Sequence, residues 1–522
     1  MSSAVTLAIV RDLLVSVCEE MGVALERAAT SINVRERRDY SIAIFDARGR
    51  ALVSGDHMPV HLGSMPLSME AILAKLRPGP GDVAILNDPF DGGTHLPDIT
   101  MAAPVFAGRR LLFFVACRAH HSDVGGMTPG SMPLATEIFQ EGFRIPPMLY
   151  VRRGRVDGAF LTLLLQNVRT PGERVADLAA QRACLDLGAR RLAGLCARDR
   201  SLPRTAARLF DYAARATSAV IRQIPRGRFA FEDALDDDGI DGNAIPIAVA
   251  ISRRGGTLEI DFRRSGAQVR GSVNAGRAVT VSAVAYVLRC LSGAEVPMGS
   301  GCLRDVRILT RPGSVVDALA PAAVCGGNVE TSQRIVDVLL GALAKAIPGI
   351  PAASQGTMNN VALGGTRPDG SAFAYYETVG GGTGASTRRD GLSAVHSHMT
   401  NSRNSPVEIL ESLYPVRVRR YAVRRGSGGA GRRRGGDGIV REIEALVPAT
   451  LTLLTERRRI RPWAIAGGRP GKPGRNTLVG TTGDRVLPSK ATLALREGDV
   501  IRVETPGGGG HGAPVKARAQ HL

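Results

Sequence analysis

The sequence has few aromatic residues and no paired cysteine motif. Phe, Trp and Tyr make up 4% of its 522 residues, and Trp463 is the single tryptophan. The hydrophobic cores must therefore be built from Leu, Val, Ile and Ala. The seven cysteines are widely spaced and contain no C-x-x-C pair. Such cysteines argue against a disulfide framework or a structural zinc knuckle, and they favour a reducing compartment.

Long apolar runs are also missing. The longest, residues 111–117, is far shorter than the roughly 20 residues that a bilayer-spanning helix needs. Near the N-terminus, Arg11, Glu19 and Glu20 lie within an amphipathic pattern that a secretory signal would not contain. We therefore expect a cytoplasmic protein.

Lysine is scarce although the chain is strongly basic. The net charge is +19, and only five of the 67 basic residues are lysines, which leaves 62 arginines. The arginines are dispersed, with local clusters at residues 417–425, 432–434 and 457–461. A nucleic-acid-binding protein would show basic patches interleaved with stacking aromatics, or a recognisable motif, and neither is present. The surplus charge instead suits an acidic partner subunit or a phosphorylated ligand.

A phosphate-binding loop is absent too. The chain contains no G-x-x-x-x-G-K-[ST] motif, and its nearest glycine–lysine stretch, residues 467–474, contains Gly-Lys-Pro. The glycine-rich segments 427–431 and 507–510 lack the following helix that would make a phosphate cradle. The sequence therefore predicts no nucleotide site on this chain.

Hydrophobic periodicity predicts a mixture of helices and strands. Leu178, Leu185 and Leu192 recur with period seven, which in so short a stretch indicates core packing rather than a coiled coil. The predicted helices cover residues 4–30, 171–196, 205–224 and 331–346. The predicted strands cover residues 41–45, 51–53, 82–86, 110–116, 257–262 and 306–310. The predicted fold class is therefore mixed α/β (α+β), with several domains.

Changes in composition along the chain predict four regions. Residues 1–170 form an N-terminal α/β domain with loops rich in His and Asp, and residues 171–225 form a helical segment. Residues 226–385 form a mixed α/β middle domain, and residues 386–522 form a β-rich C-terminal domain dominated by glycine and arginine. No long linker separates these regions, so we expect them to pack closely.

Two short motifs carry the chemistry. Residues 87–98 (NDPFDGGTHLPD) and 120–126 (HHSDVGG) each contain His-x-x-Asp and each follow a predicted strand. Imidazole and carboxylate groups are the usual ligands of Zn²⁺, Mn²⁺ or Fe²⁺. Either motif alone is also compatible with a solvated loop. The two together favour one metal ion held between neighbouring loops.

The same loops resemble the signature motifs of the hydantoinase B/5-oxoprolinase family. That family includes N-methylhydantoinase B subunits, the hydrolytic part of 5-oxoprolinase, caprolactamase, and the large subunits of acetone and acetophenone carboxylases. The likeness continues along almost the whole chain. It is carried by residues 33–41, 57–66, 167–171, 177–181, 327–333, 401–408, 427–431, 434–438 and 505–510.

The resemblance implies a set of metal ligands and catalytic residues. His95, Asp98 and His120 are the first candidates, and Asp123 is the next. Asp39, from the Glu-Arg-Arg-Asp motif, is implied to complete the ligand shell. The expected cofactor is one divalent ion, either Zn, Mn or Fe. His95, Asp98, His120 and Asp123 are also the candidate catalytic residues.

Other histidines are weaker candidates. His57 and His61 are interpreted as packing or capping residues, and His121 as a packing residue or a neighbour of the ligands. A substrate pocket is predicted near residue 400, because two histidines in alternation would share one face of a strand. Its candidate substrate-binding residues are His396, His398, Asn401 and Arg403.

The resemblance also implies a partner. In the family, ATP binds to a separate hydantoinase A-type subunit or to a fused N-terminal half, and this chain begins directly at the B-type part. We therefore expect a hetero-oligomer in which an A-type ATP-binding subunit carries ATP and Mg²⁺.

The expected function is that of the catalytic B-type subunit of an ATP-dependent cyclic-amide hydrolase, which opens a hydantoin, 5-oxoproline or another lactam. A lactam carbonyl is a poor electrophile until the partner phosphorylates it, and a metal-bound water with a pKa of about 7 then attacks. The first alternative is the large subunit of an ATP-dependent ketone carboxylase. The second is a non-catalytic scaffold subunit that is stabilised by an ion.

Overall fold

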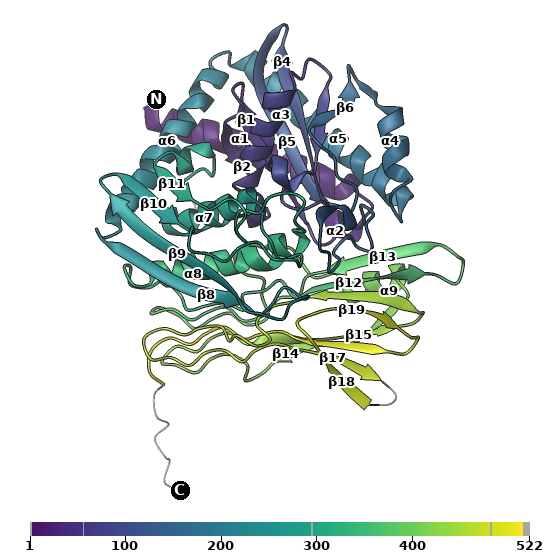
Figure 1. The fold of residues 1–522 in the computed structure, drawn as a ribbon. Helices are drawn as coiled ribbons and strands as arrows, with labels where there is room; N and C mark the ends of the chain where they lie inside the picture. Colours follow the sequence, from purple (N-terminus) through teal and green to yellow (C-terminus); the bar gives the residue numbers. More distant parts are fainter. Residues whose placement is uncertain (1–2, 56, 294–295, 481–482, 515–522) are drawn as a thin grey trace.

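The structure, a computed structural model, describes residues 3–55, 57–293, 296–480 and 483–514. Four β-sheets and several long helices make up these residues (Figure 1), which confirms the predicted mixed α/β class. Helices and sheets alternate in the N-terminal and middle parts, whereas strands and extended segments dominate the C-terminal part. Within the described ranges, none of the helices combines the length and apolar character that a membrane span requires.

The N-terminal sheet has seven antiparallel strands in the order β2-β1-β5-β4-β3-β6-β7. The long hairpin of β4 and β5 forms its centre. The strands are β1 (Tyr40–Asp46), β2 (Ala51–Ser54), β3 (Val83–Leu86), β4 (Asp98–Ala107), β5 (Arg110–His120), β6 (Met148–Arg152) and β7 (Arg155–Val156).

Both faces of this sheet are covered, so its strands are apolar on both sides. Ile42 and Ile44 of β1 pack into one core with the helices α1, α5 and α6, whereas Ala43 and Phe45 pack into another core with α3. This alternation follows the two-residue period of a strand. The helices that cover the sheet are α1 (Ser3–Ala28), α3 (Ser64–Lys75), α5 (Pro171–Arg198) and α6 (Leu202–Gln223). Two shorter helices, α2 (Ile32–Arg35) and α4 (Gly158–Leu165), belong to the same part of the chain.

The middle part contributes a four-stranded sheet in the order β11-β10-β9-β8. Two helices, α7 (Arg277–Ser292) and α8 (Ser332–Leu343), pack against each other and share a core with this sheet. One turn of π-helix, η5 (Gly327–Thr331), leads into α8. The strands are β8 (Arg228–Leu235), β9 (Ile245–Arg254), β10 (Thr257–Asp261) and β11 (Val306–Leu309).

Two further sheets pack together over one shared core. The first has the order β13-β12-β16-β19, and the second has the order β14-β15-β20-β17-β18. The first consists of β12 (Asn360–Thr366), β13 (Ala372–Glu377), β16 (Ala449–Leu454) and β19 (Lys490–Leu495). The second consists of β14 (Val416–Arg424), β15 (Gly438–Ala445), β17 (Arg475–Gly480), β18 (Gly483–Leu487) and β20 (Val500–Glu504), and the short α9 (Val407–Leu413) precedes it.

The glycine-rich segments pack against one another. They run side by side as extended chains beside the C-terminal sheets (Figure 1). Gly429 N donates to Gly508 O, and Gly508 N donates to Gly436 O, each at 2.9 Å. A Cβ on Gly508 would lie 2.0 Å from the carbonyl oxygen of Thr383. Because chains this close leave no room for a side chain, glycine is required there.

Every predicted helix and strand corresponds to an observed element, but most of the observed strands were not predicted. The helices at 4–30, 171–196, 205–224 and 331–346 are α1, α5, α6 and α8, and the predicted strands are β1, β2, β3, β5, β10 and β11. Leu178, Leu185 and Leu192 are all buried in the first core, as core packing requires.

The four predicted regions stay predictions, but two features bear on their boundaries. Helices α5 and α6 of the predicted helical segment 171–225 share one core with α1 and the N-terminal sheet. Strand β12 lies before the predicted boundary at residue 385, and it pairs with β13 on one side and with β16, which lies after the boundary, on the other. The chain therefore crosses these boundaries through packed cores and hydrogen-bonded sheets.

Candidate metal centre

Three predicted ligands meet at the ends of two central strands. Asp98 is the first residue of β4 and His120 is the last residue of β5, and the two are direct partners in the antiparallel ladder. Directly opposed residues hold their side chains about 5 Å apart. His95 reaches the same point from the turn just before β4. Strand register therefore brings together two motifs that lie 22 residues apart.

The three ligand atoms are spaced as they would be around one ion. His95 Nε2 lies 3.1 Å from His120 Nδ1 and 3.2 Å from Asp98 Oδ1, and His120 Nδ1 lies 3.1 Å from the same oxygen. Ligands bound at about 2.1 Å with tetrahedral or octahedral angles lie roughly 3.0–3.4 Å apart. In the described part of the chain, this is the single group of three or more His, Cys, Asp or Glu residues whose ligand atoms all lie within 4.8 Å.

Burial and donor chemistry also fit a divalent cation. All three side chains are buried, with His95 at 1%, Asp98 at 1% and His120 at 2% exposure. Two imidazoles and a carboxylate suit Zn²⁺, Mn²⁺ or Fe²⁺. The outer ring nitrogens, His95 Nδ1 and His120 Nε2, are shielded from solvent and form no hydrogen bond within the described residues. Three such polar side chains are costly to bury without a cation between them.

The Asp98 carboxylate is held by groups on both sides. Its Oδ2 accepts a hydrogen bond from the Thr94 hydroxyl at 2.5 Å and lies 3.2 Å from His61 Nε2. The other nitrogen of His61, Nδ1, lies 2.9 Å from the Ser41 hydroxyl. Burial raises the pKa of Asp98, but the charges of His95 and His61 outweigh it and hold that pKa well below its usual value. Asp98 is therefore an anion, the form that binds a cation.

An aromatic wall closes the centre from the C-terminal half. The Tyr376 ring, on β13, stacks on the His120 imidazole with 4.7 Å between centroids and a 19° tilt. Tyr376 is fixed in turn, because its hydroxyl donates to Asn360 Oδ1 at 2.7 Å and the Arg37 guanidinium lies 5.1 Å from its ring. The centre thus forms where the N-terminal sheet meets β13.

The other two predicted ligands lie in different surroundings. Asp39 precedes β1, and its carbonyl accepts a hydrogen bond from His120 N at 3.0 Å, while its carboxylate lies 4.0 Å from Arg37 Nη2. The Asp123 carboxylate accepts hydrogen bonds from Gly125 N, Gly130 N and Arg169 Nη1 at 2.9, 3.1 and 3.0 Å. Asp39 therefore borders the three-residue cluster, whereas Asp123 anchors the loop that follows it.

His121 points away from the cluster. Its Nε2 lies 2.9 Å from Gln181 Oε1 on α5, and burial lowers its pKa to about 4. The neutral imidazole packs between β5 and α5, which fits the predicted packing role.

The predicted substrate-binding residues lie near a large cavity. Its volume is 970 Å³, and His396, His398 and Asn401 are among the residues that line it, whereas Arg403 is not. The segment around the two histidines is irregular and not a strand, and His398 has a positive φ of 56°. The expectation that they share a strand face was therefore wrong, because the chain turns between them.

The two histidines have different neighbours. His398 lies 3.4 Å from the Tyr286 hydroxyl and 3.7 Å from Asp337 Oδ1. Both ring nitrogens of His396 are shielded from solvent and form no hydrogen bond within the described chain. Burial lowers the pKa of His396 to about 4, so the ring is neutral. The cavity is joined to the centre by η1 (Pro59–His61), because Pro59 lines the cavity and His61 contacts Asp98.

A family model described as hydantoinase B/oxoprolinase matches residues 3–514. The chain belongs to this family. Among its relatives, 5-oxoprolinase 1 of Arabidopsis thaliana is 37% identical over 541 residues, which cover 98% of this chain and 42% of that protein. The chain thus spans about two-fifths of the length of that curated relative.

Two solved structures share the fold. The ATP-dependent caprolactamase from Pseudomonas jessenii matches with a TM-score of 0.90 and 28% identity, over 98% of this chain and 91% of that chain. Acetone carboxylase, in its nucleotide-free structure, matches with a TM-score of 0.91 over 98% of this chain and 76% of that chain. Its identity is 17%, so this second likeness shows the fold alone.

Sequence reasoning missed two neighbours of this family's candidate centre. His61 was interpreted as a packing or capping residue, yet it contacts Asp98. Tyr376 lies 256 residues beyond His120, and no local pattern links the two. The 57–66 motif contains His61 and could have indicated that this residue lies near the site. For Tyr376, the sequence offers only its position beside Tyr375 and Glu377, which does not indicate a contact with His120.

Proposed function

We propose that this chain is the catalytic B-type subunit of an ATP-dependent cyclic-amide hydrolase that opens a hydantoin, 5-oxoproline or related lactam. The observation that carries the proposal is the buried convergence of His95, Asp98 and His120 within about the spacing of one ion's ligands. The names of two family members, 5-oxoprolinase and ATP-dependent caprolactamase, support the substrate class.

In this proposal, His95, Asp98 and His120 hold one divalent ion, which is Zn, Mn or Fe. Asp39 borders the centre and is the candidate for a further ligand, whereas the contacts of Asp123 favour a role in shaping the loop. The ion supplies Lewis acidity, which polarises a carbonyl and acidifies a water molecule.

The surrounding side chains prepare the ligands. His61 and Thr94 hold the Asp98 carboxylate, so that its free lone pairs point in a fixed direction. Tyr376 fixes the plane of the His120 ring by stacking. Burial excludes bulk water from all three ligands, which strengthens their electrostatic interaction with a substrate.

The 970 Å³ cavity is the proposed entry for substrate. Its size lies in the range of about 300–1,000 Å³ that is typical of small-molecule sites. Neither ring nitrogen of His396 has a hydrogen-bond partner within the described residues, and His398 and Asn401 line the same cavity. We propose that these three bind the polar groups of the cyclic amide, and that Arg403, which lies outside the lining, contacts them only after a local movement.

The proposed reaction also uses a second protein or domain that binds ATP. A lactam nitrogen donates electrons into its carbonyl, so the carbonyl must be activated before water attacks it. We propose that a hydantoinase A-type subunit, with ATP and Mg²⁺, phosphorylates the carbonyl oxygen. The caprolactamase chain that this protein matches over 91% of its length is ATP-dependent by name, which supports the use of ATP.

The test is ATP turnover by this chain together with a hydantoinase A-type subunit. Hydantoins, 5-oxoproline, other lactams, and small ketones with bicarbonate are offered in turn, and ring-opened or carboxylated products are identified by mass spectrometry. We expect a cyclic amide to stimulate ATP hydrolysis, and His95→Ala to abolish product formation. His511→Ala, a histidine substitution outside the centre, serves as the control and should leave turnover unchanged.

Two outcomes would contradict the proposal. Product formed only from a ketone with bicarbonate would make the chain the large subunit of a ketone carboxylase. Full product formation by His95→Ala in a complex with normal thermal stability would leave a scaffold subunit with a structural ion.

A further inference from the structure

A second cavity, of 700 Å³, lies where the loops after β8, β14 and β16 meet the β17–β18 hairpin. It shares no lining residue with the metal centre or with the cavity near His396. Its cationic lining residues are Arg424, Arg458, Arg459, Arg461, Lys472 and Arg475. Asp237, the single acid in this lining, lies 3.5 Å from Lys490 and accepts a hydrogen bond from Ser489 at 2.8 Å. The lining is therefore strongly positive.

Most of this charge has no anionic partner. Of the six cations, Arg424 alone forms an ion pair within the described residues, with Glu504 at 3.1 Å. Arg458 donates instead to neutral oxygens, which are Asn476 Oδ1 at 2.7 Å and Asn359 Oδ1 at 2.7 Å. Burial lowers the pKa of Arg458 to about 10, and the charges of Glu330, Asp236 and Glu456 offset this effect only in part. An anion in the cavity would offset that cost.

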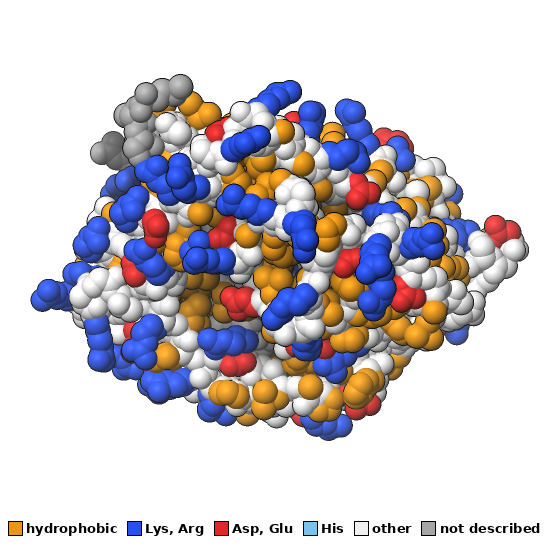
Figure 2. Space-filling view, turned by 90° about the horizontal axis from the view of Figure 1, so that it is seen from above, with side chains coloured by type: hydrophobic (Ala, Val, Ile, Leu, Met, Phe, Trp, Pro, Cys, Tyr) orange, Lys and Arg blue, Asp and Glu red, His pale blue; other side chains and the backbone are white. Residues whose placement is uncertain are grey.

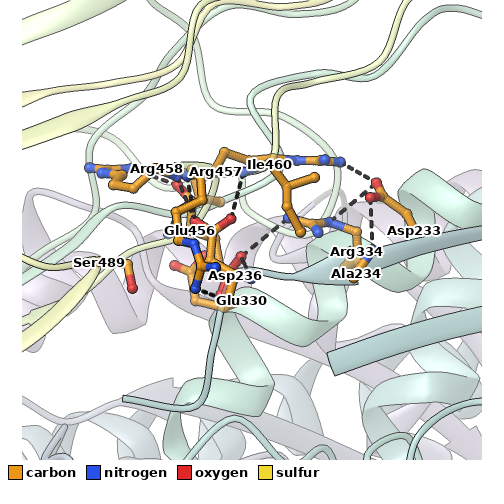
Figure 3. Close-up of polar contacts among 12 residues, drawn as sticks. Asp233, Ala234, Asp236, Glu330, Arg334, Glu456, Arg457, Arg458, Ile460 and Ser489 are labelled. Carbon is orange, nitrogen blue, oxygen red and sulfur yellow. Dashed lines mark hydrogen bonds and ion pairs between the residues drawn. The ribbon is translucent and has the colours of Figure 1, made fainter. Parts of the chain in front are cut away.

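A carboxylate fixes the arginine strip of residues 458–461 in place. Asp236 accepts hydrogen bonds from the backbone N–H groups of Arg458 at 2.6 Å, Arg459 at 3.2 Å and Ile460 at 2.8 Å. Figure 3 shows Asp236 close to this strip, with Ser489 nearby. Three consecutive N–H groups on one carboxylate hold the backbone rigid. The strip is therefore arranged before any ligand arrives, which lowers the entropic cost of binding.

Space for the guanidinium is also built in. A Cβ on Gly474 would lie 2.7 Å from Arg458 Nη1, so a larger residue there would displace the arginine. On the outer wall, Arg461, Lys472 and Arg475 are exposed and form no ion pair within the described chain. Their long side chains are free to close on a ligand that enters.

We propose that this cavity binds a small anion that carries two or more phosphate groups. Arginine presents a planar fork of N–H donors that matches phosphate oxygens, and several cations around one cavity suit several negative charges. The volume lies in the range of about 300–1,000 Å³ that is typical of small-molecule sites. Three arginines of the 457–461 cluster, Arg458, Arg459 and Arg461, line this cavity.

The test is isothermal titration calorimetry on the full chain at low and at physiological salt. Sodium tripolyphosphate is the first probe, and ATP without Mg²⁺ and inorganic phosphate follow. The variant is Lys472→Ala/Arg475→Ala, with each single substitution beside it, because both side chains are exposed. The matched control is Arg190→Ala/Arg200→Ala, which removes two exposed charges outside the cavity.

We expect one tripolyphosphate per chain, with affinity that falls as salt rises. Affinity should fall at least about tenfold in the cavity variant and less than about twofold in the control. Tighter binding of ATP than of tripolyphosphate would identify a nucleotide as the ligand, and equal binding would identify the phosphate chain. Either result supports the site.

Three results would overturn the proposal. The first is the absence of saturable tripolyphosphate binding, and the second is an equal loss of affinity in the cavity variant and in the control. The third is binding of an acidic peptide such as polyglutamate, sensitive to Lys472→Ala, without binding of any phosphate. That result would assign the cavity to an acidic partner protein.

Discussion

Two aspartates in nearly identical sequence motifs are predicted to behave in opposite ways when they are neutralised. Asp98 and Asp123 each stand three residues after a histidine, and both are buried, at 1% and 0% exposure. Asp98→Asn should remove the ion and leave the fold in place. Asp123→Asn should leave the ion in place and weaken the fold.

The contacts around each carboxylate set the size of the effect. Asp123 loses charge-assisted hydrogen bonds to Arg169 and to Gly130 N, and such bonds contribute about 1.5–3 kcal/mol each. We therefore expect Asp123→Asn to lower the free energy of unfolding by about 3 kcal/mol. Asp98→Asn removes the anionic member of the proposed ligand set, and the ion content should fall from about one per chain to about a tenth of that.

Metal analysis and unfolding measurements on the same samples show which aspartate binds the ion and which stabilises the fold. Ion content is measured by inductively coupled plasma mass spectrometry, and stability by urea unfolding with and without a chelator. If the ion is present at about 100 times its dissociation constant, removing it costs about 2.7 kcal/mol. The chelator should therefore destabilise the wild-type chain and Asp123→Asn alike, and should leave Asp98→Asn unchanged. Full ion content in Asp98→Asn, together with an empty Asp123→Asn, would refute the proposed ligand set.

Three further substitutions test the packing of the C-terminal half. Lys490→Met should cost about 3 kcal/mol in urea unfolding, because it removes the nearer of the two cations that pair with buried Glu456, at 2.6 Å against 3.4 Å for Arg334. Adding Glu456→Gln should restore part of the loss. Gly508→Ala should lower the melting temperature, because its Cβ would lie 2.0 Å from a carbonyl oxygen and collide with it. Gly172→Ala is the control and should leave the melting temperature unchanged, because its Cβ would meet nothing within 4 Å. Equal melting temperatures for the two variants would contradict the packing at Gly508. Burial raises the pKa of Glu330 from 4.5 to about 8, so the folded chain holds a proton that the unfolded chain releases, and stability should fall between about pH 5 and pH 8. Glu330→Gln should flatten that slope in unfolding curves, and an unchanged slope would show that another group titrates.

Local patterns predicted the fold class and the longest helices, but fewer than half of the strands. Apolar periodicity predicted the long helices α1, α5 and α6, because an amphipathic helix carries its burial pattern in its own sequence. The extended glycine-rich segments were visible as composition, but their packing was not. Gly508 accommodates Thr383 across the layer, and no sequence rule specifies which chain will lie there.

For the candidate site too, the sequence predicted some features and the tertiary structure decided others. The motif alone put His95 and Asp98 three residues apart in a loop after a predicted strand, and the resemblance named His120 as their companion. Local sequence also supplied the residue types that a divalent ion prefers. The family, the mixed α/β class and the three central ligand candidates were therefore predictable from the sequence.

The resemblance ranked Asp98 ahead of Asp123, and the tertiary structure gives the physical difference between them. The register of β4 against β5 sets Asp98 directly opposite His120, whereas the turn after β5 carries Asp123 towards Arg169. The tertiary structure also stacks the Tyr376 ring, from one sheet, on the His120 ring, from another sheet. The physical reason is that a strand's pairing partner and the packing of one layer on another depend on the whole chain, whereas a motif records only the spacing of its own residues.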